Sequence, residues 1–250
     1  MDTIKFQLNA RRQPYGQGAD LSLLNESVGN EVLAFHQKFP DYRVTPLRKL
    51  EFLSQRLGLG SIHIKDEAQR FGLNAFKGLG GSYAMGKYLA ALLERDINTL
   101  SFAELNSPVI KARIKDIVFV TATDGNHGRG VAWAAEQLGL RAVVYMPKGS
   151  SPVRAQNIRR HGAECTITEL NYDDTVRLAA KTAREQGWVL LQDTAWQGYE
   201  QIPTWIMQGY MTLAVEIWQQ LAESGASMPT HLFLQAGVGS FAGSIMGYFI

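Results

Sequence analysis

Several kinds of residue and motif are scarce in this sequence, and each absence narrows the possibilities. The chain has one cysteine, Cys165, so no disulfide can form within it, which is typical of a reducing compartment. Met1 to Leu8 lack the basic-then-apolar pattern of a signal peptide, and no uncharged apolar run is long enough to span a bilayer. We therefore expect a cytoplasmic protein with no membrane partner, and we interpret Cys165 as a small buried side chain.

Charged residues make up only 19% of the chain and nearly cancel, with Lys+Arg 25 against Asp+Glu 23 and a net charge of +2. The basic residues are dispersed, so we expect no nucleic-acid partner. The histidines show no HxH or HExxH spacing and a single cysteine cannot form a pair, so no metal site is predicted. Neither the GxSxG motif of serine hydrolases nor the GxxxxGK motif of phosphate-binding loops is present.

What the chain does have is a globular share of hydrophobic residues, 46% over 250 residues, arranged as alternating strands and helices. Short apolar runs about two dozen residues apart predict strands at 117–121, 142–146, 164–168 and 189–192. The first three gaps hold helical patterns that end at Gly139, Gly162 and Gly187. This alternation predicts an α/β fold with a mostly parallel sheet.

The segments on either side are less regular. Thr45-Pro46 predicts the start of a helix over 47–57 that ends at Gly58, because a capping hydroxyl precedes a first-turn proline. Periodicity predicts a strand at 61–67, a loop at 68–76, a helix from Lys77, a long helix at 199–220 and a strand at 231–235. Residues 1–42 are expected to form an arm that wraps a domain or a partner subunit. The chain stops at Ile250 inside an apolar helical pattern, so we expect the first part of a longer protein.

The first candidate for chemistry is the lysine of Asn74-Ala75-Phe76-Lys77-Gly78-Leu79-Gly80-Gly81. A desolvated lysine amine attacks aldehydes, Phe76 gives it an apolar neighbour, and the glycines leave room for a flat ligand. A lysine at a helix start is more often a solvated surface charge, and this string alone does not separate the two interpretations.

The second candidate is the turn Thr121-Ala122-Thr123-Asp124-Gly125-Asn126-His127-Gly128, which follows the first predicted strand. The carboxyl end of a strand that leads into a helix is the usual ligand position in α/β units, and free N–H groups there hold carboxylates. Asn126 can donate a hydrogen bond to a phenolic oxygen, and Asp124 can exchange a proton. The alternative is a tight turn whose side chains only cap the next helix.

The third candidate is Gly237-x-Gly239-x-x-x-Gly243, between a predicted strand and a helix. Its glycines allow backbone N–H groups to approach a phosphate, and Ser240 adds a hydroxyl. The same spacing fits a dinucleotide-binding loop, which requires an acidic residue about twenty positions further on, beyond Ile250.

Taken in this order, the three motifs resemble those of the fold type II family of pyridoxal-phosphate enzymes, which includes serine and threonine dehydratases and threonine synthase. The resemblance implies pyridoxal 5'-phosphate as the cofactor, with the amine of Lys77 bonded to it beside Phe76 and with Asn126 at its ring oxygen. It assigns the cofactor phosphate to Gly237, Val238, Gly239 and Ser240. It assigns the substrate carboxylate to the turn of Thr123, Asp124, Gly125 and His127.

The same resemblance implies two three-layer αβα domains with mostly parallel sheets, and a homodimer. The implied boundaries are a first part of the large domain with the N-terminal arm at 1–82, a small domain at 83–192, and a second, truncated part of the large domain at 193–250.

Asp124 stands where the common pattern of the family has a serine. Together with 191–196 and 199–210, it resembles the family's ammonia-lyases that act on 2,3-diaminopropionate, which implies α,β-elimination of this amino acid to pyruvate and ammonia. Lys77, Asp124 and Asp193 are then the candidate catalytic residues, and we hypothesise that a pair such as Asp124 and Asp193 lets one pocket accept both enantiomers. The group that protonates the leaving amine stays open among these three, and Asp193 can instead be a capping carboxylate before Thr194.

Three other functions fit parts of the sequence. A serine or threonine dehydratase or a β-replacement synthase of the same family shares the motifs but not Asp124. A dinucleotide- or phosphometabolite-binding module without a covalent cofactor needs only the glycine loop and a surface lysine. An inactive fragment that serves folding or assembly is the third.

Overall fold

The computed structural model describes residue 10 and residues 20–250, and its central feature is a parallel sheet with the strand order β5-β4-β3-β6. The strands are β3 (Val118–Ala122), β4 (Arg141–Met146), β5 (Glu164–Ile167) and β6 (Val189–Leu190). All three strand pairs are parallel. The four strands predicted at 117–121, 142–146, 164–168 and 189–192 all lie within two residues of their expected positions, which confirms the predicted α/β fold.

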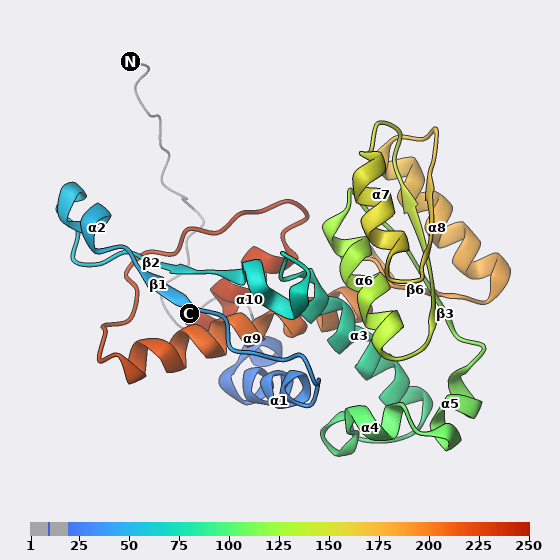
Figure 1. Ribbon diagram of the computed structural model, residues 1–250, viewed down its shortest axis with the longest axis horizontal. Helices are drawn as coiled ribbons and strands as arrows, with labels where there is room; N and C mark the ends of the chain where they lie inside the picture. Colours follow the sequence, from blue (N-terminus) through green and yellow to red (C-terminus); the bar gives the residue numbers. More distant parts are fainter. Residues whose placement is uncertain (1–9, 11–19) are drawn as a thin grey trace.

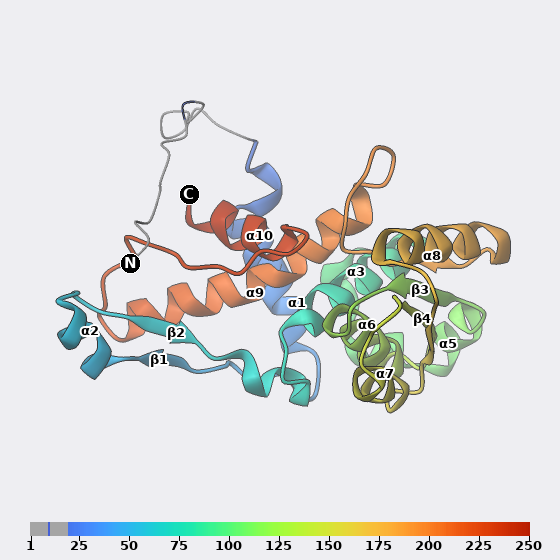
Figure 2. The same ribbon diagram turned by 90° about the horizontal axis from the view of Figure 1, so that it is seen from above.

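Helices cover both faces of this sheet, as Figure 2 shows. They are α6 (Asn126–Gln137), α7 (Pro152–Arg159) and α8 (Tyr172–Gln186). Val118 and Val120 of β3 pack towards α8 with Ala179, whereas Phe119 between them belongs to the core on the side of α6. Every residue of β3 is buried, as expected for a central strand of a parallel sheet.

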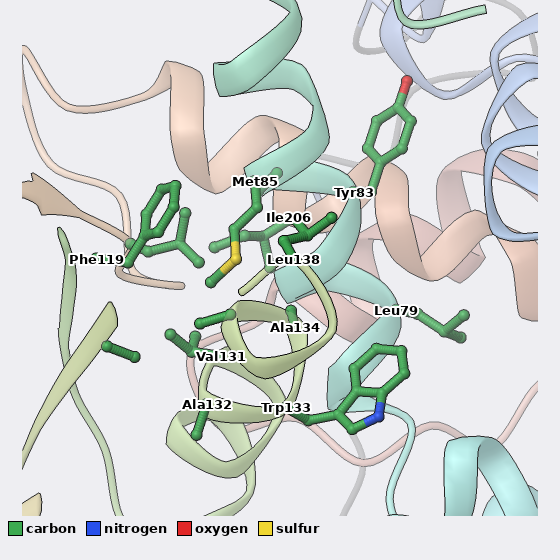
Figure 3. Close-up of a cluster of buried hydrophobic side chains, with 14 of the residues drawn as sticks. Leu79, Tyr83, Met85, Phe119, Val131, Ala132, Trp133, Ala134, Leu138 and Ile206 are labelled. Atoms are coloured by element: carbon green, nitrogen blue, oxygen red, sulfur yellow. The ribbon is translucent and has the colours of Figure 1, made fainter. Parts of the chain in front are cut away.

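Beside the sheet, α3 (Lys77–Leu92) lies between α6 and α9 (Gln201–Glu223), while α1 (Glu26–Gln37) and α10 (Ser240–Phe249) pack on α9 (Figure 1). The core joins side chains from all three central helices, among them Leu79 and Met85 of α3, Val131 of α6 and Ile206 of α9 (Figure 3). The helix predicted from Lys77 is therefore present, and it is the element that links the sheet to the second group of helices.

A two-stranded antiparallel sheet of β1 (Leu47–Lys49) and β2 (His63–Lys65), with α2 (Glu51–Leu57) between the strands, projects from this body (Figure 1). The predicted helix over 47–57 is wrong in its first half, because Leu47–Lys49 pairs with β2 instead. Thr45 does not cap a helix either, since its buried hydroxyl accepts a hydrogen bond from Arg70 Nη2 at 2.9 Å. The predicted end at Gly58 is confirmed by its left-handed φ of 65°.

The remaining elements are short. They are η1 (Ser22–Leu24), η2 (Glu67–Gly72), η3 (Ile97–Thr99), α4 (Phe102–Leu105) and α5 (Pro108–Ile114). The strand predicted at 231–235 is absent: no described strand runs beside this segment, and Phe233 is 94% exposed. Of the expected N-terminal arm at 1–42, residues 1–9 and 11–19 lie outside the described residues, and the described part contains η1 and α1, which packs on α9. Within the described part of the chain, no helix is both long enough and apolar enough to cross a membrane.

A glycine contact between α9 and α3 generates the first prediction. A Cβ atom at Gly209 would lie 2.6 Å from the Leu79 carbonyl oxygen and 2.7 Å from Gly80 Cα, both of which are backbone atoms. We expect Gly209→Ala to lower the free energy of unfolding by about 1–3 kcal/mol, because the two helices must separate. Gly60→Ala is the matched control, since a Cβ atom there meets nothing within 4 Å. Denaturant unfolding of both variants checks this, and equal midpoints would contradict it.

Candidate active site

A cavity of about 220 Å³ lies where β3 and β6 end, which is the ligand position expected for a parallel sheet. Six separate segments line it: the start of α3, the turn after β3, α7, the start of α8, the residue Asp193 after β6, and the loop before α10. Its lining residues are Lys77, Ala122, Thr123, Asp124, Gly125, Asn126, His127, Arg154, Tyr172, Asp193, Gly237 and Val238. The cavity thus brings together residues from all three sequence motifs.

Lys77 is the first residue of α3, and its side chain is only 19% exposed. Its Nζ atom lies 2.9 Å from Asp193 Oδ2 and 5.3 Å from the centre of the Tyr210 ring. Phe76 packs behind it, with its ring edge-on to Tyr210 at 5.2 Å and 4.4 Å from the ring of Phe241. The lysine is therefore a partly buried, paired group and not the solvated surface charge that the string alone allowed.

The backbone at Lys77 is fixed by close packing against α6. A Cβ atom at Gly130 would lie 2.7 Å from the carbonyl carbon of Lys77 and 2.8 Å from the amide nitrogen of Gly78. Only a glycine at position 130 permits this approach, so the direction in which α3 presents Lys77 depends on α6.

The turn after β3 is shaped by Thr123. Its buried Oγ1 accepts hydrogen bonds from the backbone N–H groups of Gly125 at 2.9 Å and Gly128 at 3.0 Å. Gly125 has a φ of 149°, a conformation that other residues rarely adopt. Among the described residues, the exposed side chains of Asp124 and Asn126 make no hydrogen bond within this turn. They are therefore available to a ligand, and the alternative in which they serve only as caps is not what the structure shows.

His127 is buried under this turn, 5% exposed. Its Nε2 atom lies 2.8 Å from the carbonyl oxygen of Leu191, so Nε2 carries a proton and donates it. Its Nδ1 atom has no hydrogen-bond partner in the described part of the chain and lies 3.8 Å from Asp193 Oδ2. Burial lowers the pKa of His127, so this imidazole is neutral at pH 7.

Asp193 is also buried and faces both bases. Burial acts to raise the pKa of its carboxyl group, whereas the charge of Lys77 and its hydrogen bond to Oδ2 act to lower that pKa. The interpretation of Asp193 as a cap before Thr194 is therefore replaced by a pairing with Lys77. The backbone carbonyl of Asp193 accepts a hydrogen bond from Ser240 Oγ at 3.0 Å, which fixes the start of α10 next to the cavity.

The glycine loop before α10 borders open space. A Cβ atom at Gly237 or at Gly239 would meet no atom within 4 Å, and Gly239 has a φ of 97°. Gly237 and Val238 line the cavity, whereas Gly239 and Ser240 lie behind them at the start of α10. The loop thus presents backbone N–H groups at a helix N-terminus, as an anion site requires.

Two cavity residues were missed by reasoning from the sequence. Tyr172 begins α8, and its place after β5, at the same edge of the sheet, was a usable signal. Arg154 of α7 donates a hydrogen bond from Nη1 to the backbone carbonyl of Asp124 at 3.1 Å, and nothing in the sequence indicated this contact. Tyr172 also lines a neighbouring groove of about 740 Å³ between α8 and residues 194–199.

Comparison with known proteins shows which family the chain belongs to. A family model described as pyridoxal-phosphate dependent enzyme matches residues 38–250. The chain belongs to this family. The match begins before β1 and includes every segment that lines the cavity.

Within the family, the chain is similar to proteins named diaminopropionate ammonia-lyase. The protein of Salmonella typhimurium strain LT2 is 76% identical over 249 residues, and that of Escherichia coli K12 is 48% identical over 250 residues. The apo crystal structure of the Escherichia coli protein has a TM-score of 0.86 and 53% identity, and the match covers 91% of this chain and 61% of that one. The chain spans 62% of the length of both curated relatives.

Proposed function

We propose that this chain carries the active site of a pyridoxal 5'-phosphate-dependent lyase, which removes ammonia from 2,3-diaminopropionate by α,β-elimination and yields pyruvate and ammonia. The observation that supports this most strongly is the amine of Lys77, held 2.9 Å from a buried carboxylate at the wall of the cavity. The similarity to proteins named diaminopropionate ammonia-lyase supports this substrate over those of the other family members.

The cavity residues fit the cofactor. Lys77 would supply the amine for its aldehyde carbon, with the Phe76 ring beside that amine, and Asn126, which lines the same cavity, would donate a hydrogen bond to its ring oxygen. The open space over Gly237 and Gly239 suits a phosphate, which the N–H groups at the start of α10, with Val238 and Ser240, would hold. When bound, the cofactor supplies a conjugated ring that stabilises negative charge at the α-carbon of the substrate.

The substrate carboxylate is held by the turn from Thr123 to His127. The first N–H groups of α6 have no partner inside the helix, so they attract an anion. Thr123 Oγ1 fixes the shape of the turn, and the hydrogen bond from Arg154 to the Asp124 carbonyl adds a second constraint. Both contacts orient the turn before a substrate arrives.

Lys77 and Asp124 are proposed to take the α-proton from opposite sides. Both line the cavity, but they belong to different walls, Lys77 at α3 and Asp124 at the turn after β3. Asp193 lies against Lys77 and therefore belongs to the lysine's side, so the pair of bases becomes Asp124 and Lys77. A crystal structure of the Escherichia coli relative in complex with D-serine supports a pocket that accepts D amino acids.

We further propose a cytoplasmic homodimer in which residues 1–82 and 193–250 form parts of a large domain and residues 83–192 a small one. All four strands of the parallel sheet lie inside 83–192, which supports this division. An oligomer is supported by exposed apolar side chains on α2, among them Phe52 and Leu57.

Replacement of Lys77 tests the proposed function. Protein mixed with pyridoxal 5'-phosphate is expected to gain a visible absorption band, which Lys77→Ala should abolish. Pyruvate formation should fall at least about 10²-fold, because the amine also acts as a base. Lys87→Ala on the same helix, whose amine lies 3.7 Å from Glu31, is the matched control and should keep both properties. An unchanged band in Lys77→Ala would disprove the assignment.

Replacement of Asp124 tests the two-sided proton removal. Asp124→Asn is expected to lower kcat/KM for D-2,3-diaminopropionate by about 10²–10⁴-fold and to spare more of the activity on the L form. Asp116→Asn, an exposed carboxylate outside the cavity lining, serves as the control. Pyruvate release from each enantiomer measures both rates, and equal losses on the two forms would count against the assignment.

A further inference from the structure

Nδ1 of His127 and Oδ2 of Asp193 lie 3.8 Å apart, and neither atom carries a proton with which to form a hydrogen bond to the other. Since Nε2 of His127 donates to the Leu191 carbonyl, Nδ1 carries only a lone pair, and it points at a carboxylate oxygen 3.8 Å away. Two bare acceptors at this separation, both in side chains that are about 95% buried, repel each other. An orphaned acceptor of this kind in a native structure calls for an explanation.

The ammonium group of Lys77 is the only positive charge that compensates this arrangement among the described residues around it. The other titratable groups that face Asp193 are Tyr172 of α8, Tyr199, and Tyr210 of α9. Burial raises the pKa of each of these three hydroxyl groups, so all of them are neutral at pH 7. The exposed Arg154 also lines the cavity, and its Nη1 atom donates a hydrogen bond to the Asp124 carbonyl at 3.1 Å.

Building on the proposed function, we propose that Nδ1 of His127 and Oδ2 of Asp193 form a two-atom proton site. The site takes up one proton when Lys77 loses its positive charge, and it later gives that proton to the departing β-amino group. A small rotation of the carboxylate shortens the separation to the length of a charge-assisted hydrogen bond, about 2.8 Å. His127 acts through Asp193 and is thus a positioning residue, whereas Asp193 delivers the proton.

The protons balance over a full cycle. Lys77 gives up one proton to the site when its amine bonds to the cofactor. With L-2,3-diaminopropionate, the free amine of Lys77 would then take the α-proton of the substrate. As the bond from the β-carbon to nitrogen breaks, its electron pair goes to nitrogen, and the proton of the site completes ammonia. When Lys77 bonds again, it returns the α-proton to the site, so no external acid is consumed.

The first test removes the charge of Lys77 without any cofactor. Lys77→Met retains the shape of the side chain but leaves Asp193 without an ammonium partner. In histidine-¹⁵N-labelled protein at pH 7, we expect the His127 imidazole to change from the singly protonated Nε2–H form in wild type to a form with a proton at Nδ1. His36 is the internal control, because it is equally buried and both its nitrogens have partners, Thr212 and Leu79.

Adding Asp193→Asn to Lys77→Met should return the His127 signal to the singly protonated form. A His127 signal that is the same in wild type and in Lys77→Met would overturn the proton site. These measurements need neither cofactor nor turnover, so they can fail while the proposed function holds. The reverse outcome, protonation of His127 in a chain that binds no cofactor, would leave the site intact and reject the function.

The second test uses the leaving group. His127→Gln keeps an N–H donor for the Leu191 carbonyl but removes the acceptor at the δ position. We expect kcat for ammonia elimination from 2,3-diaminopropionate to fall at least about tenfold, with KM little changed. Elimination of chloride from 3-chloroalanine should stay within about twofold of wild type, because chloride leaves without a proton. Equal losses on both substrates would assign His127 a purely structural role and overturn the proposal.

Discussion

The contact on which this structure depends most is the close approach of α3 to its two neighbours. Gly130 of α6 lies against the backbone of Lys77, and Gly209 of α9 lies against that of Leu79 and Gly80. A side chain at either glycine would collide with main-chain atoms, which cannot move aside as a flexible side chain can. The first turn of α3 is therefore held from two sides, and the lysine at its start faces Asp193 for this reason. The apolar contacts in Figure 3 stabilise the same helices further along their length.

Buried charged side chains are paired to different degrees in the Arg70 cluster and in the cavity. The cluster of Arg70, Glu216 and Lys65 is fully paired: both Nη atoms of Arg70 reach the Glu216 carboxylate, at 2.8 and 2.7 Å, and Lys65 adds a contact of 2.6 Å. Such a network fixes the segment that leads to Lys77. The cavity, in contrast, leaves Asp124 exposed and Nδ1 of His127 without a hydrogen-bond partner among residues 10 and 20–250. Groups left incompletely paired are free to exchange protons, and this difference separates the structural cluster from the reactive one.

Local patterns predicted the sheet well because each strand of a parallel sheet is a short apolar run closed by its own turn. They failed at Leu47–Lys49, because this segment pairs with His63–Lys65 instead of starting the helix that the leucine spacing predicts. The local sequence does not contain that pairing. In the cavity too, local motifs were predictable from the sequence and long-range contacts were not. The lysine string, the turn and the glycine loop were visible as motifs, but the pairing of Lys77 with Asp193 joins residues 116 positions apart. No spacing rule contains that contact, and the same holds for Arg154 at the Asp124 carbonyl.

The central claim is that the amine of Lys77, fixed in place by α6 and α9, is the one that bonds to the cofactor. Borohydride reduction of the protein mixed with pyridoxal 5'-phosphate, followed by peptide mapping, tests it most directly. The account predicts that the reduced cofactor is found on the peptide that contains Lys77 and on no other. Label on a different lysine, or its absence from this peptide, would contradict the account.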